Sequence, residues 1–162
     1  MKIFAAITVL SQLVLLVASK PHFPRDNSET SPQLQAYLTF LGAYTNKDYD
    51  AMAAQLTEDF IYTPMPKSLN QPQRNKTEFI AYSKGFRDQF VSTSGGIVQT
   101  TEQPGRVVLY IEGSGVTTNN RTFDNQYMVT AEIESVDGEL KVATLHEFYD
   151  SLYLSQFIAG GQ

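Results

Sequence analysis

The stretch NRTFDNQYMVTAEIE, residues 120–134, decides the fold of this chain because apolar and polar residues alternate along most of it. The alternation predicts a β-strand with one apolar face, made of Phe123, Tyr127, Val129, Ala131 and Ile133. Asn125 falls on that face, where a core residue is expected. Its amide either satisfies buried backbone groups or lines a cavity that receives a ligand, and the sequence leaves both interpretations open.

Helical patterns precede this strand. Ser31 is a predicted N-cap with Pro32 at the first helical position, and apolar residues follow at spacings of three and four up to Tyr44. Asp48 is predicted to cap a short helix over 49–56. Further along, the pair Asn75 and Glu78 predicts a capping box. The helix that follows carries aromatic residues that we expect in the core rather than on a binding platform: Phe79, Tyr82, Phe86 and Phe90.

Strands are predicted on both sides of that third helix. Before it, residues 59–66 form a short strand stopped by Pro64 and Pro66, which cannot donate to a central ladder. After it, a meander of four strands is expected, with a type II turn at 103–106 and a tight hairpin at 136–139. The glycines in 95–96 and 113–115 are interpreted as turn and bulge residues. The tail over 151–158 is compatible with a helix.

The N-terminus has the pattern of a secretory signal peptide, with Lys2, an apolar run and small residues before an expected cleavage after Ser19. We therefore expect a signal at 1–19, a flexible leader at 20–31 and one domain at 32–159, in a secreted, extracellular protein. A membrane anchor is the alternative, disfavoured by the marginal length of the run and the absence of a basic cluster after it. Secretion would make two sequons glycosylation sites, at Asn75 and Asn120.

The composition fits a packed domain without disulfides. The 162 residues include no Cys but 10 Phe and 9 Tyr, so aromatic packing is expected to hold the core. The formal net charge is −5 and the Lys and Arg residues are scattered, which disfavours nucleic acid and anionic membrane as partners. Because the sequence contains no Ser-His-Asp arrangement, Gly-rich phosphate loop or metal-ligand cluster, we expect no cofactor and no metal site.

Three segments together resemble a known family: LGAYTNKDYDAMAAQLTEDFIY at 41–62, RTFDNQYMV at 121–129, and DGELKVATLHEFYDS at 137–151. They are similar to the SnoaL-like branch of the nuclear transport factor 2-like superfamily over residues 33–151. The resemblance implies an α+β fold in which a cone-shaped, curved antiparallel sheet wraps around about three helices, a cystatin-like roll. It implies less about function, because this superfamily includes isomerases, dehydratases, cyclases, hydrolases and plain binding proteins.

The active branches of the family can be compared with the residues present. In the ketosteroid isomerase branch an Asp on the first strand removes the proton, and that position falls at Thr63 or Pro64 here. The base is therefore missing, which argues against that form of the mechanism. The dehydratase branch uses pocket histidines, whereas this domain has only His146, expected on the outer face. Arg106 and Arg121 lie at turns, so the Asp-Arg-Asp network of the epoxide hydrolases is not expected.

Candidate site residues follow from the resemblance. It places Leu145, Glu147 and Tyr149 on the cavity face of the last strand, where an apolar pocket could raise the pKa of Glu147 enough for acid–base work. The favoured interpretation is nevertheless that Glu147 is exposed or paired with a cation. The resemblance also makes Asn125 and Tyr127 cavity-lining.

The expected function is binding of a small apolar or aromatic molecule in the cone without catalysis, with Tyr62, Asn125, Tyr127 and Tyr149 as ligand-binding residues. The alternative is a cofactor-independent isomerase, cyclase or dehydratase in which Glu147 is the acid–base residue. The strand over 107–111 is apolar on both faces, which favours a homodimer formed through the sheet.

Overall fold

The computed structural model describes residues 30–160. The expected signal at 1–19 and all but the last two residues of the expected leader at 20–31 lie outside this range. The elements run in the order α1 (Pro32–Thr45), α2 (Tyr49–Ala54), β1 (Leu56–Met65), η1 (Lys67–Leu69), β2 (Arg74–Asn75), α3 (Lys76–Arg87), β3 (Phe90–Gln103), β4 (Arg106–Thr117), β5 (Thr122–Val136), β6 (Glu139–Tyr149) and α4 (Ser151–Ile158). None of the helices within residues 30–160 is long and apolar enough to span a membrane.

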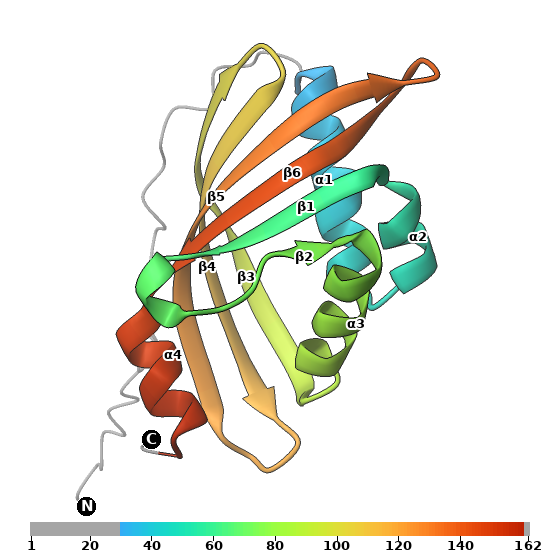
Figure 1. The fold of residues 1–162 in the computed structure, drawn as a ribbon. Coiled ribbons are helices and arrows are strands. Elements are labelled where there is room, and N and C mark those ends of the chain that lie inside the picture. Colours follow the sequence, from blue (N-terminus) through green and yellow to red (C-terminus); the bar gives the residue numbers. More distant parts are fainter. Residues whose placement is uncertain (1–29, 161–162) are drawn as a thin grey trace, which may run out of the picture.

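The six strands form one curved sheet in the order β2-β1-β6-β5-β4-β3. The sheet bends around α1, α2 and α3, and α4 lies at one end of it (Figure 1). The predicted α+β cone is confirmed. One pairing departs from the expected antiparallel sheet, because β1 runs parallel to β6, with Tyr62 opposite Leu145 and Pro64 opposite Glu147.

The predicted helix caps are all present. The side chain of Ser31 accepts a hydrogen bond from the Leu34 amide at 3.1 Å and precedes Pro32. Asp48 accepts from the Ala51 amide at 3.0 Å. Asn75 and Glu78 form a reciprocal capping box, with both bonds at 3.0 Å. These local bonds fix where α1, α2 and α3 begin, and so set which side chains of each helix face the sheet.

The predicted turns are confirmed by their backbone angles. Gly105 has φ +73°, as the third position of a type II turn requires, and Asp137 and Gly138 have φ +52° and +86° between β5 and β6.

The first strand is longer than expected and does not stop at Pro64. It continues through Pro64 to Met65, and the Met65–Pro66 peptide bond is cis. Strand β2 pairs only with Ile61 and Tyr62, so β1 is an edge strand at Pro64 and no second neighbour needs an amide donor there.

The expectation that the glycines of 95–96 and 113–115 are turn and bulge residues is wrong, because they lie within the paired strands β3 and β4, where Gly95 is opposite Gly113. The register shifts lie on either side of them in β3, at Phe90/Ser92 and Ile97/Gln99. A Cβ at Gly95 would stand 2.3 Å from the Glu112 carbonyl oxygen. The missing side chains therefore allow β3 and β4 to approach closely along the wall of the cone.

The core divides into two clusters that share one ring. The larger cluster lies between the sheet and helices α1 to α3, and the smaller one is centred on Phe90, Phe123 and Phe157 near α4. Tyr127 packs against both clusters. The space between these clusters holds the candidate site.

Candidate functional site

A cavity of about 480 Å³ lies between α1, α3 and the inner face of strands β3 to β6. Most of its wall is aromatic or aliphatic, and the aromatics expected on the third helix face it as well as packing in the core. One of them, Phe90, is the first residue of β3 rather than part of α3, which ends at Arg87. The expectation that these rings are core rather than platform is therefore incomplete, because Phe79, Tyr82, Phe86 and Phe90 serve as both. A mainly apolar, concave cavity with a few polar groups is the usual form of a small-molecule site.

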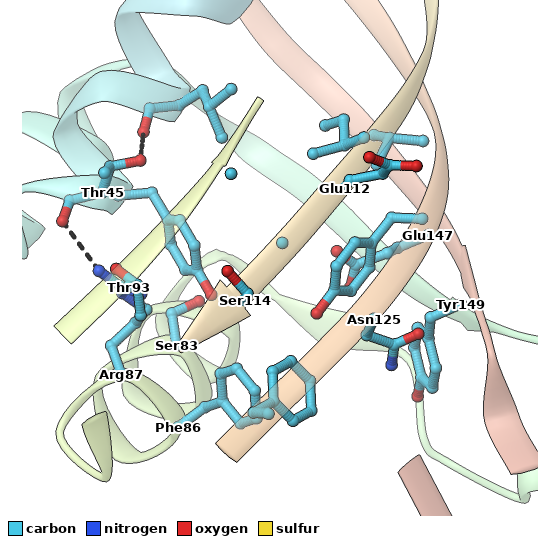
Figure 2. Close-up of a pocket in the computed structure, with 18 of the residues that line it drawn as sticks. Thr45, Ser83, Phe86, Arg87, Thr93, Glu112, Ser114, Asn125, Glu147 and Tyr149 are labelled. Carbon is cyan, nitrogen blue, oxygen red and sulfur yellow. Dashed lines mark hydrogen bonds between the residues drawn. The ribbon is translucent and has the colours of Figure 1, made fainter. Parts of the chain in front are cut away.

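Two neighbouring strands supply the polar wall. Asn125, Tyr127 and Val129 of β5 face the cavity beside Leu145, Glu147 and Tyr149 of β6. Tyr127 is opposite Tyr149 in the ladder, and Val129 is opposite Glu147. The structure thus brings together four of the predicted site residues, and Figure 2 shows Asn125, Glu147 and Tyr149 on the same side of the cavity. Their placement follows from the period-two alternation of the two strands.

Glu147 supplies the carboxyl group of this wall. Its carboxylate Oε2 accepts a 2.6 Å hydrogen bond from the Tyr62 hydroxyl, and no ion pair within residues 30–160 includes it. Burial raises the pKa of Glu147, and the Tyr62 hydrogen bond lowers it in part. The favoured expectation that Glu147 is exposed or paired with a cation is therefore wrong.

Tyr62 lies behind the wall rather than on it. Its side chain is fully buried, it is not among the residues that line the cavity, and its ring packs on Phe79 and Tyr82 with centroids 4.7 and 5.9 Å apart. The expectation that Tyr62 lines the cavity is therefore wrong. Its hydroxyl instead positions the Glu147 carboxylate by a hydrogen bond from the side away from the cavity. This hydrogen bond restricts the rotamer of Glu147.

The hydrogen bonds of Asn125 show why an amide stands on the apolar face of this strand. Its Oδ1 accepts from the backbone amides of Gln126 at 2.8 Å and Asp150 at 3.2 Å, whereas its Nδ2 is buried and has no hydrogen-bond partner. The first interpretation is therefore confirmed for the oxygen, and Asn125 also lines the cavity, while its binding of a ligand stays a prediction. The oxygen ties β5 to the end of β6, and the nitrogen is left as a free donor on a residue that lines the cavity.

The tyrosines of the cavity are neutral donors at ordinary pH. Burial raises the pKa of Tyr149 to about 12. Burial, with the charge of Glu147 as the second cause, raises the pKa of Tyr127, Tyr37 and Tyr44 still further. Each phenol therefore stays protonated and can donate a hydrogen bond to an oxygen of a ligand.

Sequence reasoning missed two polar residues of α3, Ser83 and Arg87. Both line the cavity and are nearly fully buried, at 2% and 6% exposure. The signal was the helical spacing, because Phe79, Ser83 and Arg87 follow one another at intervals of four on one face. An Arg in the last turn of a helix is ordinarily exposed, which is why this pattern is easily overlooked.

Other candidates lie away from the cavity. His146 is exposed on the outer face of β6, as expected. Thr63 and Pro64, the position of the missing base, do not line the cavity either. Asn75 and Asn120 are both exposed, so their glycosylation stays a prediction. Within residues 30–160 no three His, Cys, Asp or Glu side chains are grouped in a way that could hold a metal ion.

The comparisons with known proteins agree with this geometry. The family model of the SnoaL-like domain matches residues 35–143. Among solved structures, AusH from Aspergillus nidulans is 25% identical over 74% of this chain and 84% of its own, with a TM-score of 0.64. BvnE pinacolase from Penicillium brevicompactum is 18% identical over 83% and 95%, with a TM-score of 0.68. PrhC from Penicillium brasilianum is 15% identical over 82% and 89%, with a TM-score of 0.71.

No curated protein matches the chain. The family match covers well over half of the sequence, and the fold is that of the nuclear transport factor 2-like superfamily. The chain belongs to the SnoaL-like family of this superfamily.

Proposed function

We propose that the protein binds a small apolar or aromatic molecule in the cavity and transfers a proton on it with Glu147, as a cofactor-independent isomerase or cyclase. The observation that carries this proposal is the environment of Glu147, a carboxylate on the cavity wall with one hydrogen bond and no ion pair among the described residues 30–160. Its raised pKa makes it a stronger base than an exposed carboxylate and lets it return the proton as an acid.

The chemistry needs a donor for the oxygen that becomes negative. When Glu147 takes a proton from the carbon beside a carbonyl group, the electron pair of the C–H bond moves into an enolate and Glu147 becomes a carboxylic acid. The unpartnered Nδ2 of Asn125 and the neutral phenol of Tyr127 are donors on the neighbouring strand that can stabilise this oxygen. Return of the proton to another atom of the ligand completes an isomerisation with no net oxidation.

A non-catalytic binding protein is the second candidate. It is favoured by the scarcity of acid–base groups around the cavity, since Glu112 is an exposed residue of the wall and His146 is on the outer face. A binder needs only the aromatic wall and the polar donors, both of which the cavity has. The two candidates differ in one respect, namely whether the bound molecule exchanges protons.

A measurement of proton exchange distinguishes the enzyme from the non-catalytic binding protein. Purified protein is first screened by melting temperature against extract of its source, since a ligand of the folded state raises the Tm. The captured molecule, and 1-tetralone as an enolisable aromatic ketone, are then incubated in D2O and followed by NMR. We expect catalysed exchange of the hydrogens beside the carbonyl by wild type, and a loss of roughly 100-fold or more in Glu147→Gln.

The Glu147→Gln variant should keep ligand affinity, because the amide has the shape of the carboxylate. Glu112→Gln, which neutralises an exposed carboxylate of the same cavity, is the matched control and should exchange at the wild-type rate. Binding with no exchange by either form leaves the non-catalytic binder, whereas equal catalysed exchange by wild type and Glu147→Gln rules out Glu147 as the acid–base residue.

A further inference from the structure

The guanidinium of Arg87 is buried in the cavity wall with little to balance its charge. It lies in the last turn of α3, and one nitrogen, Nη2, donates to the backbone oxygen of Thr45 at 2.9 Å. Its Cζ lies 5.3 Å from the centre of the Tyr44 ring. No carboxylate within residues 30–160 pairs with it, and its Nε is buried without a hydrogen-bond partner.

These contacts explain only part of the arrangement. Thr45 is the last residue of α1, so its carbonyl belongs to the negative end of that helix and compensates part of the charge. A buried cation ordinarily has an anionic partner, because desolvation of an isolated charge is costly. The structural role of Arg87 at the end of α1 therefore leaves its charge without an anionic partner, and its Nε without an acceptor, among residues 30–160.

A second unpartnered group stands one helical turn away. Ser83, four residues before Arg87 on the same face of α3, is buried, and its Oγ has no hydrogen-bond partner. Both side chains line the cavity. Two unsatisfied polar groups on one face of one helix, one of them charged, indicate a place for an oxygen-bearing anion.

The position of Arg87 and Ser83 relative to Glu147 indicates how a ligand would be oriented in the cavity. Figure 2 shows Arg87, Ser83 and Thr45 on one side of the cavity, and Glu147, Asn125 and Tyr149 on the other. An anion beside Arg87 would therefore be held away from the Glu147 carboxylate. The apolar body of the ligand would lie between the two ends, among the aromatic rings.

We propose that Arg87 and Ser83 form an anion-binding end of the cavity, so that the ligand is an apolar or aromatic molecule with one oxyanion, a carboxylate or an ionised enol. The oxyanion accepts from Nε of Arg87 and from the Ser83 hydroxyl. This inference deepens the proposed function, and rests on it for the cavity as the ligand site but not for the proton transfer by Glu147.

The test compares two probes of nearly equal shape, 2-naphthoate and its neutral analogue 2-naphthamide, by calorimetric titration of the purified protein. Wild type should bind 2-naphthoate roughly tenfold or more tightly, since hydrogen bonds to charged groups are worth more than neutral ones. The preference should persist in 0.5 M NaCl, because a buried pair is weakly screened. Equal affinities, or no binding of either probe, would overturn the proposal.

Substitutions test whether Arg87 causes the preference for 2-naphthoate. Arg87→Gln should bring the two affinities to near equality, and Arg87→Lys should keep part of the preference, since Lys retains the charge but not the planar geometry. Ser83→Ala should reduce the preference without removing it, and serves if Arg87→Gln does not fold. Lys84→Gln removes a cation from the exposed side of the same helix and should leave the preference intact.

An unchanged ratio of affinities in every folded variant of Arg87 and Ser83 overturns the anion-binding end. The proton-transfer proposal fails separately, because Glu147→Gln can leave exchange unchanged while wild type still prefers 2-naphthoate.

Discussion

Replacing Glu147 with Gln should stabilise the protein against unfolding, and the gain should grow as the pH rises. Burial raises the pKa of the Glu147 carboxyl above its ordinary value of 4.5. At a pH between 4.5 and the higher pKa of the folded state, Glu147 keeps its proton in the folded protein but has lost it in the unfolded chain. The stability contributed by this group is therefore fully present below pH 4.5 and is lost as the pH rises through the folded pKa. Gln has the same shape and no charge, and so escapes this loss.

The magnitude follows from the contacts of the carboxylate. Among residues 30–160 it has one hydrogen bond, from Tyr62, and no ion pair. A buried polar group that lacks partners costs about 1–3 kcal/mol, and we take the lower part of this range, about 1–2 kcal/mol, because the side chain of Glu147 is only partly buried. For a domain of this size, 1 kcal/mol corresponds to about 3–5 °C in Tm. The Tm of Glu147→Gln minus that of wild type should therefore rise by about 3–10 °C between pH 4 and pH 8.

Thermal unfolding followed by far-ultraviolet circular dichroism, in half-unit steps from pH 4 to 8.5, measures this difference. Glu112→Gln is the control for the loss of an exposed carboxylate from the same cavity. A Tm difference for Glu147→Gln that stays flat or falls with rising pH would refute the reasoning, since the carboxylate would then be solvated or paired in the folded state.

Two further predictions concern the protein outside the cavity. On the outer face of the sheet Phe148 and Met128 are opposite one another in the ladder and are 47% and 48% exposed. We propose that two copies of the chain form a homodimer through this surface. Light scattering should then give a dimer mass for wild type at micromolar concentration and a monomer mass for Met128→Glu. A monomeric wild type contradicts the dimer. We also propose secretion, so intact mass of protein from the culture medium should show a chain that begins after Ser19 and carries glycans at Asn75 and Asn120. A full-length, membrane-retained product contradicts secretion.

The features that could be predicted from the sequence are those with local causes. The alternation along β5 and β6 puts Asn125 and Tyr127 on one face of their strand and Glu147 and Tyr149 on one face of theirs. The resemblance to the SnoaL-like family was needed to predict that these faces line the cavity. The helix caps likewise depend on bonds between residues three positions apart.

The features that were missed depend on contacts between distant segments. The parallel pairing of β1 with β6 joins Tyr62 to Leu145, and nothing near either residue signals it. For the same reason the role of Tyr62 was misjudged, because its face of the strand is predictable but the residue that its hydroxyl meets is not. Arg87 was within reach of helical periodicity, but whether a guanidinium in a last turn finds a carboxylate depends on the whole fold.

The ring of tyrosines around the cavity has an optical consequence. The chain contains no tryptophan, so its near-ultraviolet emission comes from its 9 tyrosines alone. Five of them line the cavity, namely Tyr37, Tyr44, Tyr82, Tyr127 and Tyr149. A molecule held there would touch more than half of the emitting groups, and an aromatic one that absorbs at their emission wavelength would quench them. The protein therefore carries an intrinsic fluorescent reporter of its own occupancy, and ligands can be sought without a label.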